Sequence, residues 1–238
     1  KTEVAKVMAA ALDRELVRLQ CYEGLDESKA LYEWNYQKQL LSIQVNMNAQ
    51  DREALTRSLF SDEYLLERPL LKSIRSEKPV VLLIDEVDKA DLEFPNDLLW
   101  ELDRMEFHIP ETGRTVTAKH RPVVIITSNA EKELPDAFLR RCVFHYIEFP
   151  DQEQMEAILR VHFGNLDEKL VKQALAAFYW LRELRGIEKK PSTSELVDWI
   201  RALVAGGVAP ERIEREIPFA GVLLKKDKDL QTLGKARR

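Results

Sequence analysis

The sequence predicts an α/β domain with a parallel sheet flanked by helices, followed by an all-α domain. Three observations lead to this prediction. Apolar β-type segments alternate with longer helical patterns in the first 150 residues, as in βαβ units. Residues 80–84 and 123–127 are almost continuously apolar, which is typical of strands buried on both faces of a sheet. After Pro150 the periodicity is helical only, so we place the domains at residues 1–150 and 151–238.

In the first domain we expect strands at residues 16–21, 80–85, 123–128 and 145–149. Helices are expected at residues 2–12, 28–44 and 94–104, and in pieces over 48–72. Residues 105–118 alternate polar and apolar side chains around Thr112-Gly113, which predicts a β-hairpin with Gly113 in the left-handed turn position. Met105, Phe107 and Ile109 would share one face of that hairpin.

In the second domain we expect amphipathic helices at residues 151–163, 167–184 and 192–204. Asp151 is a suitable N-cap, and Ser192 with Glu195 three residues later has the pattern of a capping box. Residues 210–238 contain a short helix, an apolar stretch and a charged tail, which we interpret as a solvated end.

Composition excludes several classes of protein. The chain has 238 residues, of which 45% are hydrophobic and 32% charged, so it is neither disordered nor fibrous. No stretch approaches the roughly 20 apolar residues of a membrane helix, and we expect no membrane span. Two cysteines cannot build a disulfide scaffold, so we expect a cytoplasmic protein. The net charge of −5 argues against a general nucleic-acid binder, although a local basic patch is compatible with it.

The strongest chemical signal is the acidic pair Asp85-Glu86 after the apolar segment 80–84. At the carboxyl end of a parallel strand these side chains would reach the crevice where α/β sheets bind ligands. Asp85 could hold Mg²⁺, and Glu86 could orient or deprotonate an attacking water. A single acid there would be read as a helix N-cap, but the Asp-Glu pair favours nucleotide hydrolysis.

A second signal is Lys1-Thr2, which runs directly into a helical pattern. Phosphate-binding loops end in Gly-Lys-Ser/Thr before a helix, with Lys reaching the phosphates and Thr holding Mg²⁺. The glycines and the preceding strand are not in this sequence, so taken alone the pair indicates only an arbitrary chain end. Its spacing ahead of the acidic pair fits the order loop, helix, strand, helix, acidic strand.

Two further segments carry polar residues at the ends of elements. Asn129 follows the apolar segment 123–127 and could position a water near a γ-phosphate; a simple turn residue is an equal alternative. Arg140 and Arg141 close a short helical segment, and arginine stabilises transferring phosphate charge. On local evidence we favour the alternative, in which they satisfy the helix dipole.

Taken together and in this order, these segments resemble the AAA+ ATPases, and more closely their MoxR-type branch. The similarity is carried by LLIDEVDKAD (82–91), HRPVVIITSNAEKELPDAFLRRC (120–142) and CYEGLDESKALYEWNYQKQLL (21–41). The predicted hairpin fits as well, because this branch carries a β-hairpin insertion at that place; whether it grips substrate or packs on a neighbour stays open. The resemblance extends from residue 1 to about residue 224.

The resemblance implies a P-loop NTPase-type sheet with ATP and Mg²⁺ as cofactors, and a helical lid. Lys1 and Thr2 correspond to the end of the Walker A loop, and Asp85 and Glu86 to the Walker B acids. Thr2 and Asp85 would then be the metal-organising residues, and Asn129 would correspond to sensor 1.

The resemblance also implies partners. Arg141, with Arg140 as its rival, corresponds to the arginine finger that reaches the site of the next subunit. Such a finger requires a homo-oligomer, normally a hexameric ring. Members of this branch remodel or activate protein clients, often with a von Willebrand factor A-domain partner, and metalloenzyme maturation is one theme.

The sequence departs from the family pattern at two places. The chain begins inside the Walker A loop, so we expect a truncated start and poor nucleotide binding by these residues alone. The sensor 2 arginine is unassigned, because Glu195 stands about where related proteins have Arg. Two alternatives are a nucleic-acid-directed AAA+ motor and a non-hydrolysing AAA+ scaffold.

Overall fold

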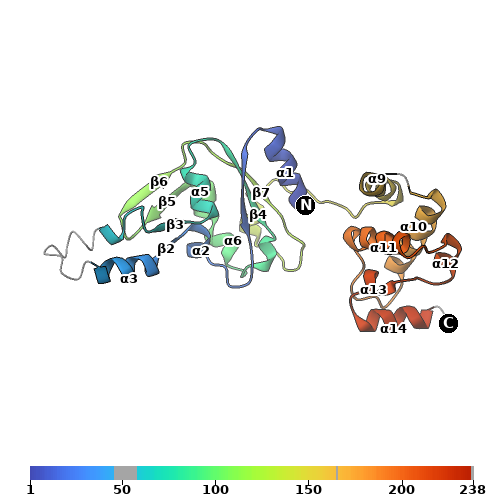
Figure 1. Cartoon of the computed structure of the whole chain (residues 1–238). Coiled ribbons are helices and arrows are strands. Elements are labelled where there is room, and N and C mark those ends of the chain that lie inside the picture. Colours follow the sequence, from blue (N-terminus) through green and yellow to red (C-terminus); the bar gives the residue numbers. More distant parts are fainter. Residues whose placement is uncertain (46–57, 165, 237–238) are drawn as a thin grey trace. The chain divides into compact units, whose positions relative to one another are not determined.

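The computed structural model describes residues 1–45, 58–164 and 166–236. The described chain divides into two compact units, unit 1 (Lys1–Ile147) and unit 2 (Glu148–Arg238). Both are shown in Figure 1. Unit 1 contains the strands and unit 2 is helical. The predicted fold class is therefore confirmed: a parallel sheet flanked by helices, followed by a helical part.

The central sheet of unit 1 is parallel and has the order β1-β4-β7. Its strands are β1 (Glu15–Gln20), β4 (Val80–Asp85) and β7 (Val123–Ile126), which agree with the predicted segments to within two residues. β4 is the central strand and is buried over its whole length, because helices pack on it as well as neighbouring strands. The register pairs Gln20 with Asp85, so the carboxyl ends of β1 and β4 lie next to each other.

Two expectations about this sheet were wrong. Residues 145–149 form no strand; Phe144 and Tyr146 are exposed. β7 is half-buried rather than buried on both faces. Both differences have the same physical reason. A strand needs a neighbour to satisfy its backbone N–H and C=O groups, and in the described residues β7 pairs only with β4.

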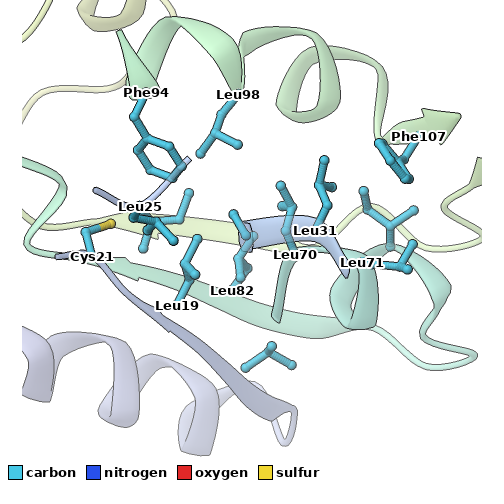
Figure 2. Close-up of a cluster of buried hydrophobic side chains, with 14 of the residues drawn as sticks. Leu19, Cys21, Leu25, Leu31, Leu70, Leu71, Leu82, Phe94, Leu98 and Phe107 are labelled. Carbon is cyan, nitrogen blue, oxygen red and sulfur yellow. The ribbon is translucent and has the colours of Figure 1, made fainter. Parts of the chain in front are cut away.

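The hydrophobic core of unit 1 lies between the sheet and its helices. α1 (Thr2–Ala11) and α5 (Pro69–Arg75) both contact β1 and β4. Figure 2 shows Leu19 and Leu82 of adjacent strands together with Leu25 and Leu70. A short 3-10 turn (Val87–Lys89), α6 (Phe94–Asp97) and α7 (Leu99–Arg104) follow β4, and Phe94 is buried in the same cluster.

The long helix expected at residues 28–44 is interrupted. The chain forms α2 (Glu27–Leu31), β2 (Tyr32–Trp34) and α3 (Tyr36–Val45), and β2 pairs antiparallel with β3 (Leu65–Glu67). Aromatic residues favour strands, and here Tyr32 contacts Phe107 while the ring of Trp34 meets Phe60 edge-on. Tertiary packing overrides the helical pattern. Part of the expected helical region 48–72 lies outside the described residues.

The predicted hairpin is confirmed as β5 (Glu106–Ile109) and β6 (Arg114–Thr117), which pair antiparallel. Gly113 has φ +66°. A left-handed residue is what the turn requires, and glycine adopts it without a Cβ clash. Met105, Phe107 and Ile109 are all buried, so they do form one inward face.

Unit 2 contains the three predicted helices, α9 (Gln152–Phe163), α10 (Glu168–Glu183) and α11 (Thr193–Ala205). The Asp151 carboxylate accepts the Gln154 N–H at 2.8 Å, and the Glu195 carboxylate accepts the Ser192 N–H at 2.6 Å. Both predicted caps are confirmed. The core of unit 2 is apolar and includes Met155, Phe178, Leu196, Trp199 and Ile200.

The charged tail is not a solvated end. After α12 (Pro210–Arg215) and α13 (Ala220–Leu223), the chain forms α14 (Asp227–Ala236). The buried Asp229 carboxylate accepts the N–H groups of Glu188 at 2.8 Å and Lys189 at 3.2 Å, and Leu233 is buried. These long-range contacts hold the helix, and a local charge pattern does not reveal them. None of the helices in the described parts of the chain is long and apolar enough to span a membrane.

Candidate functional site

Five of the residues proposed from sequence converge at the carboxyl edge of the parallel sheet. Asp85 and Glu86 lie at the end of β4, and Asn129 follows β7. The N-terminus of α1 lies at the same edge, because the Lys1 ammonium donates to the Ser128 carbonyl and to Asn129 Oδ1, the latter at 3.1 Å. The parallel register causes this meeting, since all three strands end at one side of the sheet.

The Asp85 carboxylate is the buried centre of this group. Thr127 Oγ1 donates to its Oδ1 at 2.6 Å, and Thr2 Oγ1 lies 3.1 Å from both carboxylate oxygens. Arg18 donates to Oδ2 from Nε at 3.0 Å and from Nη2 at 2.5 Å. Burial raises the pKa of Asp85, but the hydrogen bonds from Thr127, Arg18 and Thr2 outweigh it and lower the pKa below its ordinary value. Asp85 is therefore ionised at neutral pH.

Glu86 projects from a left-handed backbone with φ 57° and ψ 51°. Its Oε2 accepts from Lys89 Nζ at 2.8 Å and Gln20 Nε2 at 2.9 Å, and its Oε1 accepts from Asn129 Nδ2 at 3.1 Å. The hydrogen bond from Lys89 is the main reason that the pKa of Glu86 is lowered. A left-handed conformation costs a non-glycine residue about 1 kcal/mol, and such strain clusters at functional sites.

Asp88 joins the turn after β4 to the loop after β7. The residue is 2% exposed, and its Oδ2 accepts the N–H groups of Asn129 at 3.0 Å and Glu131 at 2.8 Å. The residue between them, Ala130, has φ 57°. The other oxygen, Oδ1, has no hydrogen-bond partner among the described residues. Asp88 thus fixes the backbone that carries the Asn129 amide.

Sequence reasoning missed five contributors to this group: Arg18, Gln20, Asp88, Lys89 and Thr127. Asp88 carried a visible signal, since it is the third acid of VVLLIDEVD. Gln20 and Thr127 are also polar residues at the ends of apolar segments. The same argument that singles out Asp85, Glu86 and Asn129 could therefore have found them. The Arg18 contact could not be found without the register of β1 against β4.

The two arginines are not part of this group. Arg141 Nε donates to Asp103 Oδ2 at 2.7 Å, and its Nη1 donates to the Ala137 carbonyl of α8 (Asp136–Leu139) at 2.8 Å. Arg140 is exposed. The Ala137 contact matches the helix-end alternative for Arg141. We call Lys1, Thr2, Asp85, Glu86, Asn129 and the side chains that contact them the strand-end group. Within the described chain, neither arginine hydrogen-bonds to a residue of this group.

The donor set fits a magnesium ion and a phosphate. The Thr2 hydroxyl and the Asp85 carboxylate present oxygen ligands 3.1 Å apart. Mg²⁺ prefers oxygen, keeps several waters and takes only one or two protein ligands. The adjacent Lys1 ammonium supplies a cation for phosphate oxygens.

Comparison with known proteins identifies the family. The family model "AAA domain (dynein-related subfamily)" matches residues 1–142, which is 142 of the 238 residues and so more than half of the chain. A search of curated protein sequences found no match. The chain belongs to the dynein-related AAA domain family, and the AAA+ part of the sequence resemblance is confirmed.

Two solved structures are similar to the chain at low identity. A candidate ATPase from Cytophaga hutchinsonii is 16% identical over 90% of this chain and 72% of its own, with a TM-score of 0.41. NtrX from Brucella abortus, solved in complex with ATP, is 13% identical over 95% of this chain, with a TM-score of 0.42. The match covers 54% of the NtrX chain. At these TM-scores we draw no conclusion from either structure.

Proposed function

We propose that this chain carries the catalytic part of a MoxR-type AAA+ protein that couples Mg²⁺-dependent ATP hydrolysis to the remodelling of a protein client. One observation carries the proposal. Residues up to 128 positions apart, from Lys1 to Asn129, form one connected hydrogen-bond group at a single sheet edge. Each has the chemistry that its proposed role requires. Membership of the AAA domain family supports the same activity.

Binding would be carried by Lys1 and the Thr2–Asp85 pair. The Lys1 ammonium now contacts two oxygen acceptors, the Ser128 carbonyl and Asn129 Oδ1, and phosphate oxygens of ATP would take their place. Thr2 and Asp85 would hold Mg²⁺. When bound, the ion would neutralise part of the negative charge of the phosphates.

Water attack would be prepared by Glu86 and Asn129. The pKa of Glu86 is lowered, so its carboxylate is ionised at neutral pH and can accept a hydrogen bond from the attacking water. Asn129, 3.1 Å from Glu86, offers an amide that can hold the same water or a γ-phosphate oxygen. Because both side chains are fixed before nucleotide binds, little reorganisation remains at the moment of reaction.

ATP turnover by the full-length gene product is the test of this activity. We expect Glu86→Gln to lower turnover at least 100-fold while nucleotide binding is kept, because the loss of a general base removes about 10²–10⁴ in rate. Glu93→Gln makes the same chemical change at an exposed position and should leave turnover unchanged. Equal rates for wild type and Glu86→Gln would contradict the proposal.

We also propose that Arg141, with Arg140 as the rival, completes the site of the neighbouring protomer in a hexameric ring. The support is that, within the described residues, Arg141 pairs with Asp103 and not with the group of its own chain. Arginine fingers contribute about 10³–10⁵ in rate, so the alanine variant of the true finger should be nearly inactive. Mixing it with Glu86→Gln protomers, whose fingers are intact, should restore turnover. Light scattering measures the ring.

The client is proposed to be a protein, with a von Willebrand factor A-domain partner, in the cytoplasm. The sequence segments shared with the MoxR-type branch support this assignment. A nucleic-acid motor is the alternative, and strongly salt-dependent DNA binding would favour it. A non-hydrolysing scaffold is disfavoured because it has no need for the Glu86–Asn129 pair at the ends of the strands.

A further inference from the structure

We infer that Arg18 competes with a divalent cation for Asp85, so that the site rejects the free metal ion and accepts it together with nucleotide. The inference rests on the proposed function, because it takes Asp85 as the metal-organising carboxylate. It concerns a residue that the sequence did not single out and that lies on a different strand from the acidic pair.

The geometry places the guanidinium on the carboxylate oxygen that faces β1. Arg18 stands two residues before Gln20, which is the residue paired with Asp85, so Arg18 and Gln20 lie on the same face of the strand. Two nitrogens of Arg18 donate to Asp85 Oδ2, at 3.0 and 2.5 Å, and Nη2 also donates to Gln20 Oε1.

Charge explains why the contact exists. The Asp85 side chain is 2% exposed, and a buried carboxylate is costly unless a cation compensates it. In the described residues Arg18 is the only cation that forms an ion pair with Asp85. Lys1 contacts Asn129 instead, and Lys89 contacts Glu86. Arg18 therefore compensates the negative charge of Asp85, as a bound divalent ion would.

The two cations exclude each other. A divalent ion on Asp85 would lie beside the guanidinium and would have to replace its charge-assisted hydrogen bonds. The Arg18 side chain is 49% exposed, so its end can turn into solvent. Nothing compensates a free ion for the lost Arg18–Asp85 hydrogen bonds and for the repulsion between the two cations. In a metal–nucleotide complex the negative charge of the phosphates offsets both.

The test is Mn²⁺ binding to the full-length gene product without nucleotide, followed by electron paramagnetic resonance. We expect Arg18→Met to bind Mn²⁺ about tenfold more tightly or better, because hydrogen bonds to charged groups are worth about a factor of ten or more. The same variant should melt at a lower temperature without metal and regain stability when Mn²⁺ is added. Arg18→Gln keeps an amide donor, folds more readily and should also bind Mn²⁺ more tightly.

Two controls make the result specific. Arg68→Met removes an arginine from the exposed Arg68–Glu33 ion pair and should change neither Mn²⁺ affinity nor the response of the melting temperature. Adding Asp85→Asn to Arg18→Met should abolish Mn²⁺ binding and recover the melting temperature without metal, because the uncompensated charge is gone.

The outcomes separate this inference from the proposed function. Mn²⁺ affinity that is unchanged or weaker in both Arg18 variants, but is lost with Asp85→Asn, would overturn the competition and leave the metal site intact. Mn²⁺ binding that is undetectable in both Arg18 variants, or that persists in them after Asp85→Asn is added, would overturn the metal site and the inference with it.

Discussion

Unit 1 and unit 2 differ in what they bury. Unit 1 buries the carboxylates of Asp85 and Asp88 at the edge of its sheet, beside two non-glycine residues in the left-handed region, Glu86 and Ala130. Among the described residues of unit 2, Asp229 is the only buried charged side chain, and it serves backbone N–H groups. Unit 1 retains buried charge and left-handed backbone at its candidate site. Unit 2 is built for packing, so mutations should separate activity from stability.

The largest expected effect on stability lies in the core of unit 2. Trp199 is fully buried and its indole N–H donates to the Pro218 carbonyl at 2.6 Å. Trp199→Ala should lower the free energy of unfolding of unit 2 by about 3–5 kcal/mol, through lost burial and an unfilled cavity. Urea unfolding measures it. Val161→Ala, at an exposed position on α9, should stay within about 0.5 kcal/mol; equal effects would contradict the packing of this core.

A smaller effect, on rate, is expected at Asp88. Asp88→Ala should lower ATP turnover by about tenfold to 100-fold with little change in KM, because the released loop no longer holds the Asn129 amide 3.1 Å from Glu86. Asp88→Asn keeps an acceptor and should recover most of the rate. If Asp88 acts through Asn129, the double variant with Asn129→Ala will be no slower than Asn129→Ala alone. Additive losses would refute that coupling.

A still smaller effect is expected at the first cap of unit 2. Asp151→Ala removes the acceptor for the Gln154 N–H and should destabilise unit 2 by about 1 kcal/mol. Turnover per folded molecule should not change, since Asp151 caps a helix of unit 2 and the strand-end group belongs to unit 1. Glu153→Ala, on an exposed side chain in the same turn, is the matched control. Thermal unfolding followed by circular dichroism compares the two.

The smallest effect is a change in the acid sensitivity of unit 1. The pKa of Asp85 is lowered in the folded chain, so its contribution to stability is present above its ordinary pKa of about 3.9 and is lost as pH falls through the folded value. Asp85→Asn should make the melting temperature of unit 1 less dependent on pH below about 4. An unchanged dependence would show that Asp85 is not stabilised in its ionised form.

The same contrast explains what sequence could predict. Helices of unit 2 were found from local caps, because Asp151 and Ser192 act within one turn. The helix expected at residues 28–44 and the strand expected at 145–149 failed, since strand formation depends on partners that are distant in sequence.

The residues of the candidate site follow the same rule. Asp85, Glu86 and Asn129 directly follow apolar segments, and a parallel sheet brings such positions together. Arg18 is joined to them only by the register of β1 against β4, which no local pattern carries. Asp88 is visible in the sequence as a third acid, but its contact with the loop after β7 is not.

The most direct measurement is a crystal structure of the full-length Glu86→Gln protein with ATP and Mg²⁺. We predict that the γ-phosphate lies between Lys1, Asn129 and position 86, that Thr2 and Asp85 face the metal, and that Arg18 has left Asp85. Nucleotide bound away from this edge of the sheet, with the contacts of Lys1 and Thr2 unchanged, would contradict the assignment of these side chains to a single ATP site.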